Sequence, residues 1–504
     1  MPSMRPDLGK RHVLVPAGVL LATALSACGS TVPLASSGGG GPAQTSDLTR
    51  SDGSGATATA APGSVSGVRS PGSPTGPGSA GGSGGAASTA AGSGSSHVLG
   101  GPSTGAKGVT ATQVLIGYST SKALSGVAGS LGLNGVDAGN TQAQVEAVVK
   151  DLNARGGLLG RKVVLKPYDV STSSNPQAMC TAWTQDTPVF AVVDAVNVGA
   201  PALDDTLAAC LNKAKVPLLT GSPLVSRLEY DRYPFLIAPG HAESERYMTG
   251  LVSRLLQDNF FVGWNATLGT PGKESVKIGI NSFDTPGDQS RVQALVRALR
   301  TAGYTNVVVV KHPQDVSGLP ASTQNAVLRF KSEGVTHVFG ASVLFYQDAD
   351  SQGFRPRYAV DDTANTVQLM AKNAPKSQLH GSLGAGYLPM SEDDYYTSSN
   401  PAARNCLRIM RNAGLDTTNR FAVTYMLAIC DRFSILERAV AASGSLTPAG
   451  VLLGLGRLPA GLDSAGTYAM TLGVDRHDGA FRLRGFAYVD SCSCFRLTGP
   501  TTQF

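Results

Sequence analysis

The sequence predicts an α/β protein of two lobes, each a parallel β-sheet with helices on both faces. From residue 109 onward, short β-branched apolar runs alternate with amphipathic segments of helical period. This alternation is typical of parallel sheets covered by helices on both sides. The pattern falls into two series, one before and one after about residue 239, and each series indicates one sheet.

The clearest unit lies between residues 113 and 170. Residues 114–118, VLIGY, predict a buried strand, and apolar residues recur at helical spacing over residues 145–152. Gly156 and Gly157 then end the helix, since glycine accepts the left-handed conformation that follows many helices. A second strand over residues 163–168 completes a βαβ unit, for which a right-handed crossover is expected.

Further elements follow from the same periodicities. The other predicted strands are residues 189–194, 216–219, 235–237, 276–280, 307–310 and 337–340. The other predicted helices are residues 202–212, 243–256, 289–301, 325–332, 402–411 and 422–442.

The first hundred residues have a different character. Basic residues precede an apolar run over residues 13–25, and small residues precede Cys28, so residues 1–27 predict a secretory signal peptide. The order Leu-Ser-Ala-Cys resembles a bacterial lipobox, which implies a lipidated Cys28, although a plain signal peptide with a chance cysteine is the alternative. Residues 28–108 are rich in Gly, Ser, Ala, Thr and Pro and predict a disordered linker with a root-mean-square span of about 50 Å.

The charge distribution and the cysteine content argue against a nucleic-acid-binding protein and favour an exported, disulfide-bonded one. The 41 Lys and Arg residues are interspersed with 35 Asp and Glu residues, so no nucleic-acid surface is predicted. A lipidated Cys28 leaves six of the seven cysteines, an even number that favours disulfides in an exported chain. Cys406 and Cys430 lie on consecutive predicted helices and could be bonded, whereas the state of Cys492 and Cys494 stays open. Because the seven His residues are scattered, no metal site and no cofactor are predicted.

The sequence contains no complete catalytic motif. Ser119 and Lys122 have the S-x-x-K spacing of penicillin-binding enzymes, but the companion S-D-N and K-T-G strings are absent. Residues 348–353 imitate the start of a calcium loop, but its twelfth position is Ala359 and not Glu. A binding protein is therefore predicted, and not an enzyme.

The string DLNARGGLLGRKVVLKPYDV, residues 151–170, resembles a signature of the branched-chain amino acid type (Liv-type) substrate-binding lipoproteins of ABC transporters. A weaker resemblance extends from about residue 112 to the C-terminus. The resemblance implies the type I periplasmic-binding-protein fold, with one lobe from residues 109–238 and 385–460 and the other from 239–384 and 461–504. It also implies a disulfide between Cys180 and Cys210.

In open α/β sheets, ligands bind beyond the carboxyl ends of the strands. The predicted ligand-binding residues in such loops are Ser125, Asn197, Val198, Gly199, Thr220 and Ser222 in the first lobe, and Asp284, Ser342, Asp361 and Asp362 in the second. The resemblance implies that Ser222 binds an amino-acid carboxylate and that Asp361 or Asp362 binds the ammonium group. Because residues 196–199 have no hydroxyl where the family carries one, a nucleoside, amide, sugar or aromatic acid is an alternative ligand.

The expectation is a monomeric, lipid-anchored solute-binding protein on the extracytoplasmic face of a bacterial membrane. It would capture a small polar solute between its lobes and deliver it to an ABC permease and ATPase. A ligand-sensing or envelope-scaffold lipoprotein with the same fold, without a transport role, is the alternative.

Overall fold

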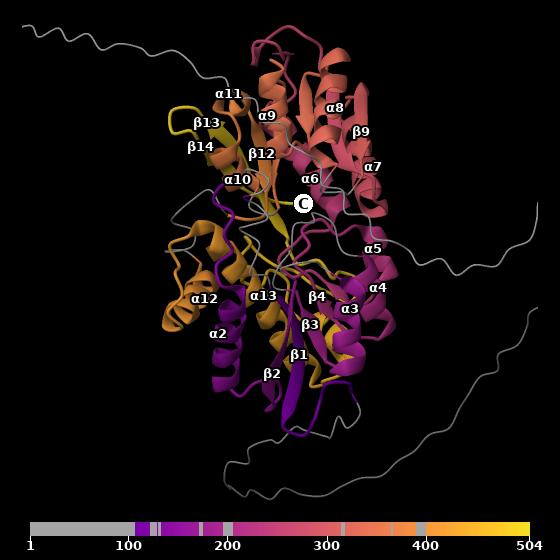
Figure 1. Cartoon of the computed structure of the whole chain (residues 1–504), viewed down its shortest axis with the longest axis vertical. Coiled ribbons are helices and arrows are strands. Elements are labelled where there is room, and N and C mark those ends of the chain that lie inside the picture. The colour runs from indigo at the N-terminus through magenta and orange to yellow at the C-terminus, as the bar shows by residue number, and fades with distance from the viewer. Residues whose placement is uncertain are drawn as a thin grey trace, which may run out of the picture. The chain divides into compact units, whose positions relative to one another are not determined.

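The computed structural model describes residues 106–120, 133–170, 175–194, 205–313, 318–363, 366–389 and 400–504, together with Gly129. These residues lie within one compact unit, residues 93–504. The predicted signal peptide, Cys28 and most of the predicted linker lie outside the described residues. Figure 1 shows the helices and strands along the chain.

The first sheet has five strands in the order β2-β1-β3-β4-β5, and all of its pairings are parallel. Its strands are β1 (Gln113–Thr120), β2 (Lys162–Asp169), β3 (Ala191–Val193), β4 (Leu218–Leu219) and β5 (Leu236–Ile237).

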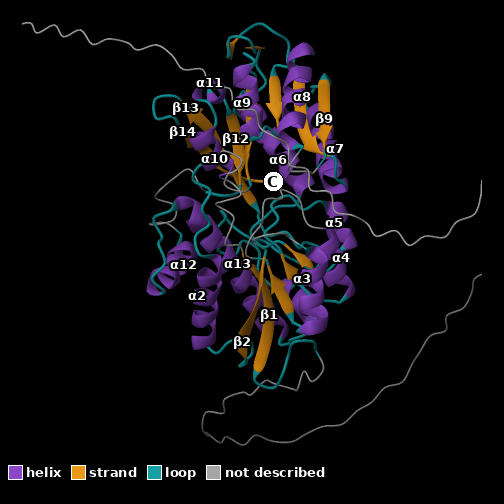
Figure 2. Ribbon diagram, viewed as in Figure 1, coloured by secondary structure: helices purple, strands orange, loops and turns teal. Residues whose placement is uncertain are grey.

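Helices cover both faces of this sheet (Figures 1 and 2). Alternate strand residues such as Ala191 and Val193 join one core, with α2 (Thr141–Ala154), α12 (Pro401–Asn412), α13 (Arg420–Ser443) and α14 (Pro448–Leu455). Val192 and Leu218 point to the opposite core, with α3 (Pro176–Thr181), the π-helix η1 (Ala182–Asp186) and α4 (Asp205–Lys213). The alternation follows from the two-residue period of a strand.

The second sheet has seven strands in the order β14-β13-β12-β11-β10-β8-β9. Its parallel part contains β8 (Ile278–Phe283), β9 (Val307–His312), β10 (His337–Phe339), β11 (Arg357–Asp362) and β12 (Leu383–Gly386). The hairpin of β13 (Arg482–Val489) and β14 (Cys494–Gln503) adds two antiparallel strands at one edge. The second sheet is therefore parallel except for its last hairpin. A separate short pair, β6 (Trp264–Asn265) and β7 (Thr270–Pro271), is antiparallel.

The second sheet is also covered on both faces. The helices α6 (Ser244–Gln257) and α7 (Pro286–Thr301) pack on one core. The helices α8 (Leu319–Ser332), α9 (Val343–Ser351), α10 (Thr366–Asn373) and α11 (Lys376–Leu379) pack on the other. Together with the first sheet, this arrangement confirms the predicted α/β architecture of two lobes.

The structure explains the motif at residues 151–170. The backbone N–H of Gly157 donates to the Leu152 carbonyl at 2.9 Å, and both Gly156 and Gly157 have positive φ. Asn153 pairs with the β2 backbone: its Nδ2 donates to the Val163 carbonyl at 2.9 Å and its Oδ1 accepts from the Val163 N–H at 2.7 Å. The helix end is thereby fixed against the strand that follows it.

Among the described residues, the core assignments place three crossings between the lobes, and two of them come later than the predicted boundaries. The first lies between Ala238 and Ala242, which join different cores. The second comes later than residue 385, because β12 ends at Gly386 and Tyr387 still packs in the second lobe.

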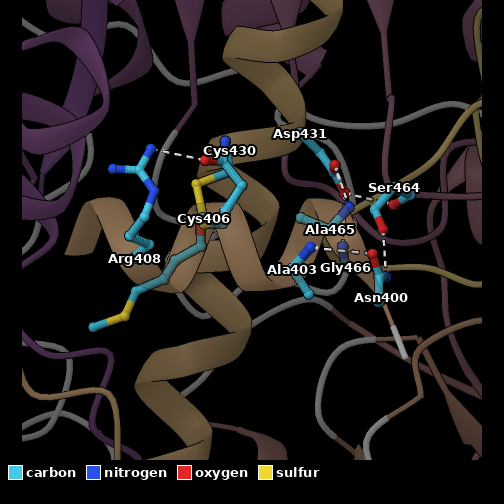
Figure 3. The surroundings of a disulfide bond; sticks show 11 residues. Asn400, Ala403, Cys406, Arg408, Cys430, Asp431, Ser464, Ala465 and Gly466 are labelled. Carbon is cyan, nitrogen blue, oxygen red and sulfur yellow. Dashed lines mark hydrogen bonds between the residues drawn. A yellow bond between two sulfur atoms is a disulfide. The ribbon is translucent and has the colours of Figure 1, made fainter. Parts of the chain in front are cut away.

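The third crossing comes later than residue 461. Leu462, Ala465, Met470 and Leu472 pack in a first-lobe core, whereas Ala480 joins the second lobe. The segment is held there by Asp431 of α13, whose carboxylate accepts from the Ser464 hydroxyl at 2.6 Å and from the N–H groups of Ala465 and Gly466 (Figure 3). These hydrogen bonds have no signature in the sequence, so the predicted boundary was wrong.

The described residues contain three disulfides. Cys180–Cys210 joins α3 to α4, and Cys406–Cys430 joins α12 to α13, as Figure 3 shows for the latter. Both are the pairs that the sequence analysis expected. Cys492 is bonded to Cys494 in the turn between β13 and β14, where Ser493 has a positive φ of 49°. The sequence analysis left the state of these two residues open, and the turn at Ser493 brings them together.

Candidate functional site

Two polar side chains meet at the carboxyl edge of the first-lobe sheet. Ser119, near the end of β1, donates its hydroxyl to Oδ1 of Asp194, which follows β3, at 2.7 Å. The backbone N–H of Gly221 donates to Oδ2 of the same carboxylate at 3.4 Å. Ser119 therefore hydrogen-bonds a carboxylate that links three strand ends. Lys122, its partner in the S-x-x-K pattern, lies outside the described residues.

The predicted residues Thr220 and Ser222 lie in the loop after β4, and both are buried. The Thr220 hydroxyl accepts from the Ser222 backbone N–H at 3.0 Å, which shapes the turn. The Ser222 hydroxyl is different, because it has no hydrogen-bond partner among the described residues. A buried hydroxyl without a partner is unfavourable, so Ser222 differs from Thr220 in having unused hydrogen-bonding capacity.

Sequence reasoning missed Arg432, which α13 places against the same loop. Its Nε donates to the Thr220 carbonyl at 3.3 Å, and a Cβ added to Gly221 would lie 2.6 Å from its Nη2. Burial lowers the pKa of this guanidinium, and the nearby Asp194 opposes that effect. The signal that could have found it is a charged residue within an otherwise apolar stretch of a long predicted helix.

In the second lobe, β11 ends with the two predicted acidic residues, Asp361 and Asp362. Asp361 is half-buried, and its Oδ1 accepts from the Thr363 hydroxyl at 3.1 Å. Asp362 is fully buried, and neither of its carboxylate oxygens forms a hydrogen bond of normal geometry with a described residue; the backbone N–H of Val367 lies near enough to oppose part of the pKa shift. Burial, followed by the charge of Asp361, raises the pKa of Asp362 well above its ordinary value.

A buried polar contact joins the two lobes beside these strand ends. Tyr387, which follows β12, donates its hydroxyl to the Pro223 carbonyl of the first lobe at 2.9 Å, and it lies 3.2 Å from Nδ1 of His241. Burial, together with the positive charge of Arg432, lowers the pKa of His241 to about 3, so this imidazole is neutral. The chain segments at the first two crossings, which contain His241 and Tyr387, are thus hydrogen-bonded to each other.

The two lobes also touch away from the crossings. Asn134, in the loop before α2, accepts from Asn373 Nδ2 at 3.0 Å through its carbonyl, and its N–H donates to Asn373 Oδ1 at 2.6 Å. Leu133 of the same loop packs against a second-lobe core. A cavity of about 270 Å³ adjoins this contact, with α10 on one side and the start of α13 on the other; its lining includes Gly135, Gln368, Lys372, Asn419 and Arg420.

Two predicted site residues have ordinary structural roles. The Asp284 side chain is exposed after β8 and forms an ion pair with Lys311 at 3.5 Å, so the structure does not place it with the buried groups. Ser342 is the N-cap of α9, and its hydroxyl accepts from the Phe345 N–H at 3.2 Å. Both predictions relied on position after a strand alone. Ser125, Asn197, Val198 and Gly199 lie outside the described residues.

Within the part of the chain that the structure describes, no group of three or more His, Cys, Asp or Glu side chains could hold a metal ion. None of the described helices combines the length and the apolar character that a membrane span requires.

Comparison with known proteins agrees with this geometry. A family model described as "Periplasmic binding protein" matches residues 117–482. A search of curated proteins found no match.

Solved structures share the fold at low sequence identity. A fatty acid ABC transporter substrate-binding protein from Thermomonospora curvata is 17% identical with a TM-score of 0.55, covering 79% of this chain and 94% of that one. A possible leucine/isoleucine/valine-binding protein from Rhodopirellula baltica is 17% identical with a TM-score of 0.54, covering 77% and 97%. A branched chain amino acid ABC transporter from Thermus thermophilus with bound valine is 15% identical with a TM-score of 0.54, covering 78% and 97%. Since the family model spans most of both lobes, the chain belongs to the periplasmic binding protein family.

Proposed function

We propose that this chain is an extracytoplasmic solute-binding protein of an ABC importer, which captures a small polar solute, an amino acid or a related compound, between its lobes. The observation that carries the proposal is the pair of buried polar groups without described partners, one at a strand end in each lobe: the Ser222 hydroxyl and the Asp362 carboxyl. A solute with complementary polar groups would provide the missing hydrogen bonds.

The solved structures of similar fold support this class of solute. Among them are a fatty acid ABC transporter substrate-binding protein and a branched chain amino acid ABC transporter with bound valine. Such ligands share a carboxylate, and hinge bending of two lobes is a general way to enclose a small molecule. No catalytic step is part of the proposal, because solute capture needs only recognition and closure.

The direct test is to identify what the protein binds. Full-length protein should be exported and purified under native conditions, then denatured, and the released small molecules identified by mass spectrometry. We expect one small polar solute in near-stoichiometric amount, which calorimetry should show to rebind. Deletion of the gene should reduce cellular uptake of that solute. Protein that releases no solute and binds none of the amino or fatty acids tested would contradict the proposal.

The proposal includes a lipid anchor at Cys28, supported by the lipobox-like residues before it. Replacing Cys28 by Ala removes the sulfur that would carry the diacylglycerol, and with it the apolar attachment. We expect Cys28→Ala protein to leave the membrane fraction or to remain unprocessed, as judged by fractionation and mass spectrometry. Correctly cleaved, unlipidated protein that stays on the membrane would argue against an anchor at this residue.

A further inference from the structure

The disulfide between Cys492 and Cys494 differs from the other two described disulfides in what it joins. The other two each link a pair of helices, across 30 and 24 residues of the chain. Cys492–Cys494 links two residues of one turn, with Ser493 alone between them, in the hairpin of β13 and β14 (Figure 1). It therefore removes much less chain entropy from the unfolded state, and of the three described bonds it stabilises the fold least.

The turn is held in shape by contacts other than the sulfur–sulfur bond. The hairpin ladder pairs Val489 with Cys494, and the Ser493 N–H donates to the Asp490 carbonyl at 3.1 Å. The Asp490 carboxylate also contacts Nδ1 of His380 at 2.8 Å, which ties the turn to the end of α11. These contacts do not involve the bond, so they would keep the two cysteines close together after its reduction.

This pair is also accessible from solvent. Cys492 is exposed and Cys494 is half-buried, whereas Cys180 and Cys406, one partner in each of the other described disulfides, are buried. Thiol–disulfide exchange requires a thiolate to reach one sulfur of the bond, so its rate depends on access. Of the disulfides in the described residues, this one is therefore the most open to attack.

The backbone between the two sulfurs favours the reduced form. Ser493 has a φ of 49°, a left-handed conformation that is unfavourable for a residue with a side chain and that hairpin turns usually give to glycine. A ring closed across this single residue leaves the backbone little freedom to relax. In addition, Sγ of Cys492 lies 3.5 Å from the Val489 carbonyl oxygen, so a thiol at this position has an acceptor in place.

The turn lies away from the candidate solute-binding groups. Leu383, the first residue of β12, pairs with Ala487 of the antiparallel β13, so β13 ends at the amino-terminal edge of the parallel part of the sheet. Asp362 is at the opposite, carboxyl edge, at the end of β11. Chemistry at the turn is therefore independent of the groups proposed to bind a solute.

We propose that Cys492 and Cys494 form a redox-active disulfide that exchanges with external thiols. In the first step, an external thiolate attacks Sγ of Cys492 and forms a mixed disulfide, while Cys494 leaves as a thiolate that takes up a proton. A second external thiol then attacks the mixed disulfide at the external sulfur and releases Cys492 as a thiol. Overall, two external thiols transfer two electrons and two protons to the pair and become joined by a disulfide.

A bond with a purely structural role would behave differently. It would resist thiols about as well as the two disulfides that link helices, and its loss would disturb the fold. The two roles therefore differ in the thiol concentration at which the bond opens and in the structure of the protein once it has opened.

The test uses glutathione as the external thiol. Full-length exported protein is equilibrated near neutral pH at a series of ratios of reduced to oxidised glutathione, alkylated and digested, and the thiol fraction of each cysteine is measured by mass spectrometry. We expect Cys492–Cys494 to be half reduced at a ratio, taken as [GSH]²/[GSSG], at least about a hundredfold lower than either other described disulfide requires. Circular dichroism of protein in which this pair alone is reduced should match that of the oxidised protein.

Single variants test the order of attack. Cys494→Ser keeps the exposed Cys492 and should take up one glutathione from its disulfide, whereas Cys492→Ser keeps the half-buried Cys494 and should do so more slowly. The double variant is the control, since it should fold as the wild type does and take up no glutathione in the turn. Equal rates in the two single variants would overturn Cys492 as the attacked sulfur. A pair that stays oxidised until the other disulfides open, or whose reduction unfolds the protein, would overturn the redox-active site.

Discussion

Ser222 and Asp362 were predicted from their place after a strand, and both proved to be buried with polar atoms that lack described partners. The same rule also selected Asp284 and Ser342, which form a surface ion pair and a helix cap. The rule selects residues at the carboxyl edge of each sheet, but it does not distinguish buried from exposed loop residues. Arg432 was missed because its position depends on how α13 packs against a distant loop, which local sequence does not encode.

The buried carboxyl of Asp362 gives the first prediction. Its pKa is raised in the folded protein, so the folded state is favoured while the group is protonated, and this advantage is lost as pH rises above the unfolded value of about 3.9. Asp362→Asn should therefore increase the free energy of unfolding of solute-free protein at pH 8, by about 1–3 kcal/mol. The gain should shrink toward zero near pH 4. Urea unfolding across this pH range provides the measurement.

The carboxylate of Asp362, which is unfavourable for the stability of the solute-free protein, should be favourable for solute binding if it pairs with an ammonium group. Asp362→Ala should then weaken binding of an amino acid several hundred-fold, from about 3–5 kcal/mol for an unpaired buried charge. Asp284→Asn is the matched control at an exposed strand end and should change stability and affinity by less than about 0.5 kcal/mol. Unchanged affinity in both Asp362→Ala and Asp361→Ala, measured by calorimetry with the released solute, would show that no ammonium is bound there.

His241 gives a second prediction, in which the protein loses stability as pH falls, the reverse of the effect at Asp362. Burial lowers its pKa to about 3 in the folded protein, against about 6.5 when unfolded, so the unfolded state binds the extra proton between these values. The protein should lose stability as pH falls through this window, by up to about 1.4 kcal/mol per pH unit for this one group. His241→Asn should reduce the slope by about one proton in calorimetric unfolding between pH 6 and 4.

The exposed His380, which pairs with Asp490, provides the control, since His380→Asn removes an imidazole from the surface. A slope that is the same in His241→Asn as in the wild type would mean that the imidazole is not buried in neutral form. In His241→Asn, stability should still depend on pH to some extent, because burial lowers the pKa of His337 to about 4 as well.

Among the elements, those with a long and regular pattern were predicted well. The unit at residues 113–170 predicted α2, its glycine termination and β2, and the structure adds that Asn153 pairs with the β2 backbone. The short helices α3, α5 (Arg227–Arg232) and α11 were missed, since fewer than two turns give no readable period. The hairpin of β13 and β14 was missed as a pair because its turn is defined by Cys492–Cys494 and not by a familiar turn sequence.

The disulfides provide a third prediction, because they close loops of very different length. Cys180–Cys210 and Cys406–Cys430 span 30 and 24 residues, whereas Cys492–Cys494 spans 2. In the chain-entropy description, removing either of the first two should lower the free energy of unfolding by about 3–4 kcal/mol, and removing the third by less than about 2 kcal/mol. Paired Cys→Ala variants, unfolded in urea, provide the comparison. Equal losses for all three pairs would contradict the expected dependence on loop length.

At the scale of the whole molecule, the number and type of the lobes were predictable, whereas their exact boundaries were not. The alternation of strands and helices gives two parallel sheets without any knowledge of contacts between them. The assignment of residues 462–472 to the first lobe depends on hydrogen bonds from Ser464, Ala465 and Gly466 to Asp431, which are long-range contacts. The contacts that hold the lobes together are of the same kind, since each involves residues far apart in the sequence.

The last prediction concerns the contact between Asn134 and Asn373, where two hydrogen bonds join a first-lobe loop to the second-lobe helix α10. If this contact stabilises a closed arrangement of the lobes, Asn373→Ala should lower the population of that arrangement in solute-free protein. The apparent affinity for the released solute should fall by the same factor, about tenfold for two neutral hydrogen bonds. Small-angle X-ray scattering should show a larger radius of gyration for the solute-free variant and an unchanged radius at saturating solute. Asn405→Ala, an exposed change on α12, should leave both quantities as in the wild type. Equal scattering and equal affinity in Asn373→Ala would mean that the contact accompanies closure without stabilising it.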